Sequence, residues 1–420
     1  MDLINIYHGT NNIKPKVLLQ HFLRTIGFYV EHIMGEFHAR KSEAVAEVYI
    51  IDNNYVDEYG TQINYEDDKS ILIFSDEWSL KDLLLRAKAV SYDEMNEKKF
   101  LVDFIDALDE IMEGKISCER LIHSDLQWKE TVTSVADAYI KHDIMPVTQY
   151  TRCFHAQDNL YHMALRNYVQ FINELRDLSQ DNDSSLLKYI LLYAQFELNR
   201  ICKQNNYEYY VSNSKLLLFC EQLISKFNTN EELCLLRADI LFELQDDWLE
   251  AWKYYQVKPV RHCSYVYYKC GRIARLYLSD YDNAIPLLKR AIEMKPDYYQ
   301  AIYQLASCYE MTGEYEASIE CFLQISEVCK KKYRYHLLAP IELEYLYKSY
   351  IKVALINQNR LGNNLAAYEY SEMAERIKKE AEDTTFLGQV WPAMLKKDAL
   401  LKEIKEEMCK HMNAQIQKMF

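Results

Sequence analysis

Residues 299–322 read YQAIYQLASCYEMTGEYEASIECF, and this stretch decides the fold. Its apolar residues recur at helical spacing on both sides of Gly313, which predicts two helices joined by a short turn. Glycine at the turn can adopt a positive φ and end the first helix. The small Ser318 lets the two helices approach closely, and Tyr315 fills the space between them. One such hairpin cannot bury its own apolar face, so we expect further hairpins to stack on it.

Two earlier segments share this pattern, and all three align on an aromatic residue followed three positions later by a small one. The aligned pairs are Trp248 and Ala251, Tyr281 and Ala284, and Tyr315 and Ser318, at intervals of 33 and then 34 residues. A period near 34 with these residues resembles the tetratricopeptide repeat, a helix–turn–helix unit. The second copy carries one extra residue between Gly271 and Tyr281, which leaves the register of its first helix open.

The resemblance implies a binding protein, because stacked first helices of such repeats line a groove for a peptide or helix. The third copy is expected to turn Gln300, Tyr303, Ser307 and Glu310 into the groove, and the second copy Tyr265, Tyr268, Arg272 and Arg275, if its extra residue falls in the turn. The two arginines either hold a carboxylate or phosphate of a protein partner or form ordinary salt bridges to neighbouring repeats. The sequence also leaves open that the chain forms a homo-oligomer.

The composition fits long helices and an acidic binding protein. The chain has 420 residues, 49% of them hydrophobic, with only 9 glycines and 7 prolines, and a formal net charge of −14. This charge argues against direct binding of nucleic acid or of an anionic membrane. The 11 cysteines are scattered with no C-x-x-C pair, which predicts buried, reduced thiols such as Cys220, Cys234, Cys308 and Cys321, and no metal site. Without a signal peptide or an apolar run of about 20 residues, we expect a cytoplasmic protein.

The pattern of apolar residues changes along the chain. Residues 1–115 alternate between β-type runs and helical patterns, which predicts a small α/β domain. The expected strands are 4–7, 47–51 and 71–74, and the expected helices are 14–28, 79–90 and 96–112. Beyond this domain we expect a helical connector at 116–160, an all-α tetratricopeptide-type solenoid at 161–390 and a C-terminal capping helix at 391–420. The last helix could instead bind a partner or a second copy.

One segment of the first domain carries a candidate for chemistry. In SILIFSDEWSLKDLLLRA (70–87) a strand is followed by Ser75, then by Trp78, and then by a helical pattern that contains Asp82. This resembles a strand and helix of Toll/interleukin-1 receptor (TIR) domains, whose catalytic glutamate corresponds to Asp82. Flavodoxin-like domains share the layout, and the plainer interpretation is that Ser75 or Asp76 caps the helix and Trp78 packs.

No nucleotide-binding glycine motif occurs in the chain. The sequence therefore favours a scaffold or adaptor without a cofactor, with a groove for a protein partner and a second docking surface on the α/β domain. The alternative is a partner-regulated effector of a microbial defence or signalling system, which cleaves NAD with Ser75 and Asp82.

Overall fold

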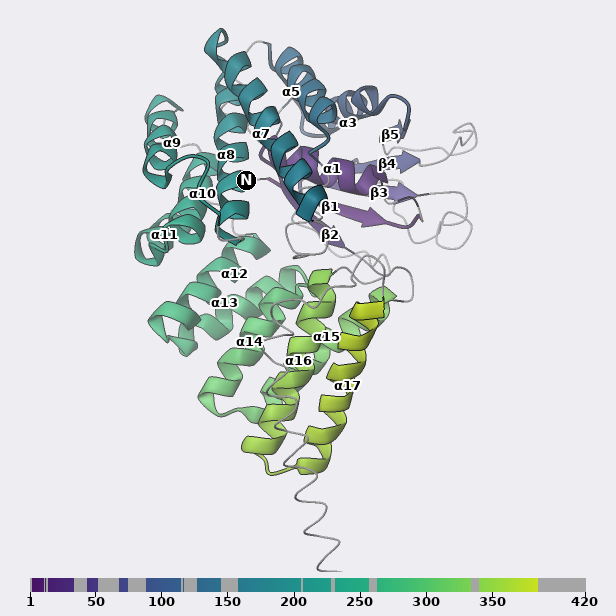
Figure 1. Ribbon diagram of the computed structural model, residues 1–420, viewed down its shortest axis with the longest axis vertical. Helices are drawn as coiled ribbons and strands as arrows, with labels where there is room; N and C mark the ends of the chain where they lie inside the picture. Colours follow the sequence, from purple (N-terminus) through teal and green to yellow (C-terminus); the bar gives the residue numbers. More distant parts are fainter. Residues whose placement is uncertain are drawn as a thin grey trace, which may run out of the picture. The chain divides into compact units, whose positions relative to one another are not determined.

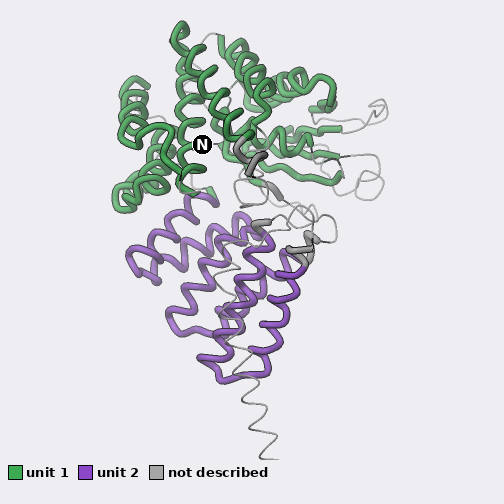
Figure 2. Tube along the Cα trace, in the orientation of Figure 1, with its two compact units in different colours: residues 1–151, 159–263 green, residues 152–158, 264–420 purple. Residues whose placement is uncertain are grey.

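The structure is a computed structural model, and it forms two compact units (Figures 1 and 2). Unit 1 comprises residues 1–151 and 159–263, and unit 2 comprises 152–158 and 264–420. The residues that the structure describes are 2–10, 12, 14–33, 44–51, 68–74, 88–114, 116, 127–144, 158–204, 207–227, 231–256, 263–333 and 340–383.

Unit 1 begins with a parallel five-stranded sheet in the order β2-β1-β3-β4-β5. The strands are β1 (Leu3–His8), β2 (Tyr29–Ile33), β3 (Ala46–Ile51), β4 (Ser70–Phe74) and β5 (Lys88–Ser91). The apolar runs β1, β3 and β4 are buried along nearly their whole length, as expected for strands inside a parallel sheet. This strand order is the flavodoxin-like one, and the predicted α/β domain is confirmed.

Two strands were not predicted. One of them, β5, shows that the helix expected at 79–90 is wrong at 88–90, while residues 79–87 lie outside the described residues. Lys88–Ser91 pairs in parallel with β4, so that backbone hydrogen bonding with a buried neighbour overrides the helical pattern of the sequence. The other strand, β2, follows Gly27, whose φ of +95° ends α1 (Lys14–Thr25). A side chain at Gly27 would collide with the ring of Tyr189, which lies on α8 (Ser185–Gln204).

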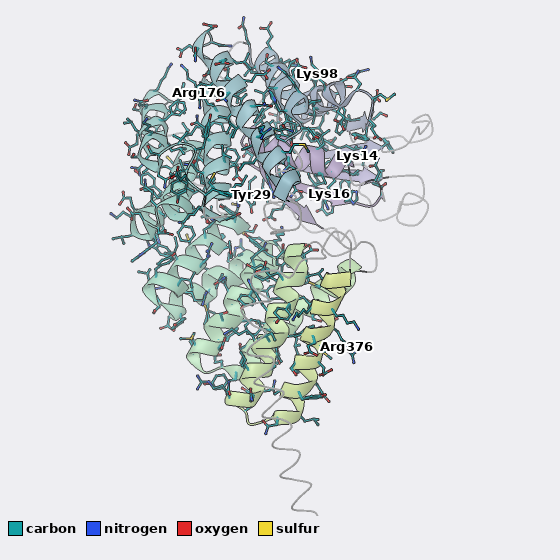
Figure 3. The ribbon with its side chains drawn as sticks, in the orientation of Figure 1. Lys14, Lys16, Tyr29, Lys98, Arg176 and Arg376 are labelled. Carbon is teal, nitrogen blue, oxygen red and sulfur yellow. The ribbon has the colours of Figure 1, made fainter. Side chains whose placement is uncertain are left out.

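The rest of unit 1 is helical in the residues described. It contains α3 (Glu97–Ile111), α5 (Trp128–His142), α7 (Asp158–Gln180), α8 (Ser185–Gln204), α9 (Asn213–Phe227), α10 (Glu231–Asp239), the π-helix η2 (Ile240–Leu244) and α11 (Trp248–Tyr255). Tyr139 of α5 packs edge-to-face on Phe22 of α1 at 5.7 Å and on Phe171 of α7 at 6.0 Å. Lys98 of α3, which Figure 3 labels, pairs with Asp137 of α5 at 2.7 Å. The α/β part of unit 1 thus shares a core with helices beyond residue 115.

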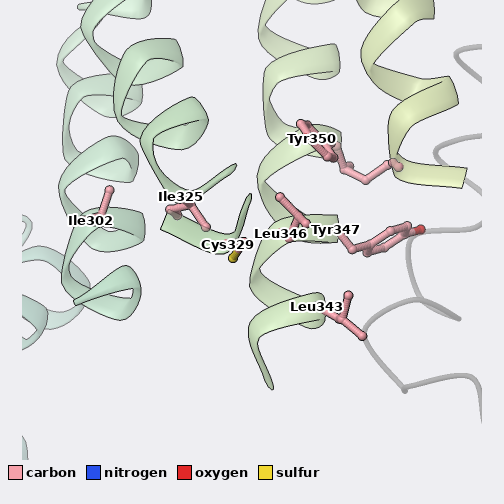
Figure 4. Packing of buried hydrophobic residues seen from close by; sticks show 9 residues of the cluster. Ile302, Ile325, Cys329, Leu343, Leu346, Tyr347 and Tyr350 are labelled. Atoms are coloured by element: carbon pink, nitrogen blue, oxygen red, sulfur yellow. The ribbon is translucent and has the colours of Figure 1, made fainter. Parts of the chain in front are cut away.

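Unit 2 is a stack of three helical hairpins in the residues described. These are α12 (Ser264–Ile273) with the π-helix η3 (Ala274–Leu278) and α13 (Tyr281–Met294), then α14 (Tyr299–Thr312) with α15 (Tyr315–Tyr333), and α16 (Pro340–Asn359) with α17 (Asn364–Asp383). Each helix contacts the next one along the chain. Ile302, Ile325 and Tyr347, from three successive helices, are fully buried in one apolar cluster (Figure 4). The predicted α/β domain followed by an all-α repeat region is therefore confirmed.

The packing positions read from the sequence lie where the helices of a hairpin meet. Ala251, Ala284 and Ser318 are each 0% exposed. The hydroxyl of Ser318 donates to the carbonyl of Ala306 at 2.8 Å, across the two helices of one hairpin. Gly313 adopts the predicted positive φ, 85°, and ends α14.

The extra residue of the second copy lies in the π-helical last turn of its first helix. There the amide of Asp280 donates to the carbonyl of Ala274, six residues back, whereas in the third copy Glu314 donates to Tyr309, five residues back. A π-turn accommodates one additional residue without disturbing the helix before it. The register of α12 relative to α14 is therefore unchanged up to Ile273.

Candidate functional site

The first helices of the hairpins in unit 2 lie side by side, because α14 contacts both α12 and α16. Residues at equivalent positions form three rows across these helices. We call them together the A-helix face: Tyr268, Tyr303 and Tyr345; Arg272, Ser307 and Ser349; Arg275, Glu310 and Lys352.

The first row consists of tyrosines. The rings of Tyr303 and Tyr345 meet edge-to-face at 5.4 Å, and Tyr299 approaches Tyr345 at 5.1 Å. Tyr268 packs instead on Tyr298, at 5.0 Å. Burial raises the pKa of Tyr303 to about 12, so its hydroxyl stays neutral at physiological pH and can donate a hydrogen bond.

The second row is small on two of its three helices. The hydroxyl of Ser307 donates to the carbonyl of Tyr303 at 2.9 Å, and Ser349 donates in the same way to Tyr345 at 2.7 Å. These serines satisfy their own hydroxyls within the helix. On α12 the equivalent position is Arg272, which is half-buried. The first helix of this hairpin therefore has a positively charged residue where α14 and α16 have serine.

The third row is charged on each helix. Lys352 pairs with both carboxylate oxygens of Glu310, at 2.8 and 3.0 Å, and so links α16 to α14. Arg275 donates from Nε to Oε1 of Gln304 at 2.6 Å. Burial lowers the pKa of Arg275, and the nearby charge of Arg272 lowers it further. The partner of Arg275 in this hydrogen bond is a neutral amide.

All eight residues predicted for the groove lie on α12, η3 and α14. Tyr265, Arg272, Arg275, Gln300, Tyr303 and Glu310 are half-buried, while Tyr268 and Ser307 are 8% and 6% exposed. The structure brings most of them together in the three rows. Sequence analysis missed Tyr345, Gln304 and Lys352. Tyr345 and Lys352 had the right spacing from one another, but α15 and α16 are longer than a repeat of 34 residues allows.

The predicted catalytic residues Ser75 and Asp82 lie outside the described residues. At the carboxyl edge of the sheet, His8 ends β1 and is 8% exposed; its Nε2 lies 3.1 Å from the carbonyl of Asn12. Within the described ranges, no three His, Cys, Asp or Glu side chains gather as metal ligands would. Over the same ranges, no helix combines the length and apolarity needed to cross a membrane.

Comparison with known proteins identifies the repeat. The family profile described as "Tetratricopeptide repeat" matches residues 276–338. Among solved structures, a human IFIT1 dimer with PPP-AAAA is similar to this chain, with 13% sequence identity and a TM-score of 0.35 over 74% of this chain and 82% of that chain. No curated protein sequence matches the chain. The profile match covers the segment from which the sequence predicted a tetratricopeptide repeat, and that prediction is confirmed.

Proposed function

We propose that this chain, which contains tetratricopeptide repeats, is a cytosolic interaction scaffold that binds a segment of a protein partner on the A-helix face. The observation that carries the proposal is the alignment of three rows of residues on α12 with η3, α14 and α16, of which one consists of tyrosines and one of charged residues. Tyr303 and Tyr345 are only partly buried, and a partly buried tyrosine offers apolar area together with a hydrogen-bonding tip, which suits a binding surface. A second docking surface lies on the α/β part of unit 1.

The chemistry of the face indicates an acidic group on the partner. Arg275 is held by the neutral Gln304, and Arg272 lies close enough for its charge to lower the pKa of Arg275. A carboxylate or phosphate of the partner would relieve this repulsion and match the guanidinium geometry. The acid on the neighbouring helix, Glu310, is already engaged by Lys352. We therefore place the acidic group of the partner at the α12 end of the face.

Site-specific photo-crosslinking tests this proposal on the full chain. A photoreactive amino acid at Gln300, on α14, is expected to capture a partner that is identified by mass spectrometry. The same amino acid at Arg290, which is exposed on α13, serves as the control position. Charge reversal by Arg272→Glu should abolish the capture, whereas Arg290→Glu should leave it intact. Equal capture from both positions, or capture that survives Arg272→Glu, would show that the partner does not use this face.

A second function is an effector in which an enzyme is governed by the repeats. The observation that favours it is the flavodoxin-like strand order, since such sheets bind ligands at the carboxyl ends of their strands. Ser75 directly follows β4 in sequence, and the TIR-like segment continues to Asp82. Incubation of the purified chain with NAD, alone and with a captured partner, should then release nicotinamide, and Asp82→Asn should stop the release. If no nicotinamide appears under either condition, this function is excluded.

A further inference from the structure

Exposed apolar side chains of unit 2 gather at the turns within its hairpins. In the described part of the unit, six of the seven exposed large apolar residues lie within three positions of the left-handed residues Ser279, Gly313 and Gly362, which mark these turns. We call these six the turn ridge: Leu276, Tyr277, Leu278, Met311, Leu361 and Leu365. The turns α12–α13, α14–α15 and α16–α17 follow one edge of the unit (Figure 1).

Folding does not require apolar residues at these positions. Leu276 and Leu278 are 44% and 40% exposed, and Leu365 is 67% exposed. The hairpin of α10 and α11 has the same π-turn and a left-handed residue at Asp246, yet it carries Glu243 and Gln245 where the next hairpin carries the two leucines. Polar residues therefore suffice at the positions of Leu276 and Leu278 in a turn of this kind. Exposed apolar residues that the fold does not need, gathered at successive turns, are typical of an interaction surface.

Acidic side chains flank the turn ridge. Asp282 lies in the first turn of α13, and Glu314 and Glu316 lie at the start of α15; all three are exposed. Neither Asp282 nor Glu316 takes part in an ion pair with the residues that the structure describes. Acids near a helix N-terminus also stabilise the helix. Glu314 lies within electrostatic reach of Lys289, and Arg360 lies over the ring of Tyr315, so the negative charge offered to a partner is that of Asp282 and Glu316. A second copy of this chain would place the same acids against one another, and the chain is acidic as a whole. Electrostatic repulsion therefore disfavours a second copy as the molecule that covers the ridge.

We infer that the turn ridge binds a basic amphipathic helix of a partner protein. The apolar stripe of this partner helix would cover Leu278, Met311 and Leu365, and the lysines of the helix would lie beside Asp282 and Glu316. Such helices anchor through residues spaced three and four apart, which fits a row of separate apolar points. This surface is distinct from the A-helix face, so the inference stands or falls independently of the proposed function.

A designed probe tests the inference with the full chain. The probe is a fluorescein-labelled peptide of roughly 18 residues with leucine and lysine in amphipathic helical order. It should bind, and a peptide with glutamate in place of lysine should not. The triple variant Leu278→Ser, Met311→Ser, Leu365→Ser should weaken binding at least about tenfold, since it removes the apolar anchors. The matched control Leu218→Ser, Leu249→Ser, Met373→Ser removes three equally exposed apolar residues elsewhere and should bind as the wild type does.

Four results would overturn the inference. The first is unchanged binding in the triple variant while circular dichroism shows it folded. The second is loss of binding through Arg272→Glu alone, which would move the probe to the A-helix face. The third is tighter binding of a peptide with the sequence of residues 392–420, which would make the chain its own ligand. The fourth is a concentration-dependent dimer that the triple variant abolishes, which would make a second copy the occupant.

Discussion

At the scale of single residues, the contact between the helices of a hairpin explains which side chain each position tolerates. In the hairpin of α14 and α15, Ala306 faces Ser318 and accepts its hydroxyl hydrogen bond. At the equivalent place in the hairpin of α12 and α13 stands Gly271, and a Cβ built on it would lie 2.6 Å from Cγ of Leu288. The branched leucine occupies the space that a methyl group needs, so glycine is required there for packing rather than for a turn.

Gly271→Ala is therefore expected to destabilise unit 2 by about 1–3 kcal/mol, the usual cost of overpacking a core. On propensity alone the same change in a helix would be favourable by about 1 kcal/mol. In a Leu288→Ala background the clash is absent, and Gly271→Ala should be neutral or stabilising. Urea unfolding of the four proteins of this double-mutant cycle measures the difference. Equal cost in both backgrounds would mean that Leu288 is not the obstacle.

Glu232, in the first turn of α10, is a buried acid whose titration should be visible in the stability of unit 1. Burial raises the pKa of Glu232 from 4.5 to about 7. A raised folded-state pKa means that its stabilising contribution is complete below pH 4.5 and is lost as the pH rises through about 7. Glu232→Gln should therefore stabilise unit 1 at pH 8 by up to about 3 kcal/mol and have little effect at pH 5. Calorimetry of both proteins at the two pH values decides this, and a gain that is independent of pH would contradict it.

At the scale of elements, the π-turns η2 and η3 explain why two of the repeats are one residue longer before the turn than the third. The additional residue of the second repeat is confined to Ala274–Leu278, and α12 before it keeps the register of α14. Deletion of Leu276, which is 44% exposed, should convert η3 into an α-helical end like that of α14 and lower the melting temperature only slightly.

Deletion of Ser307 in the middle of α14 is the matched control. It should unfold the hairpin, because it rotates all later residues of the helix by about 100°. Thermal melts followed by circular dichroism compare the two deletions. An equal loss of stability from both would show that η3 does not absorb the extra residue.

The sequence predicted elements whose pattern is local and missed those that depend on distant pairing. Gly313, Ser318 and the apolar runs of α14 and α15 determine their hairpin by themselves. β5 is a strand because it pairs with β4, which no pattern within Lys88–Ser91 indicates. Only part of the candidate site was predicted, for a similar reason. The positions on α12 and α14 follow from the repeat period, whereas Lys352 lies 42 residues from Glu310, beyond that period.

At the scale of the whole molecule, buried thiols occur in both compact units. Cys220, Cys234 and Cys308 are buried, as the sequence predicted, whereas Cys321 is only half-buried. Burial raises the pKa of Cys220, in unit 1, to about 12 and that of Cys308, in unit 2, to about 11. Both thiols are therefore protonated and unreactive at pH 8 until the unit that contains them opens.

This makes the two thiols separate reporters of unit stability. Ile325→Ala removes a fully buried side chain from the core of unit 2, which should cost about 2–5 kcal/mol. Pulsed iodoacetamide labelling in graded urea, read by mass spectrometry, should then show Cys308 reacting at lower urea than in the wild type, with the transition of Cys220 unchanged. Phe171→Ala, in the core of unit 1, should do the reverse. Because each compact unit has its own core, an equal shift of both thiols in either variant would mean that the chain unfolds as a single cooperative body.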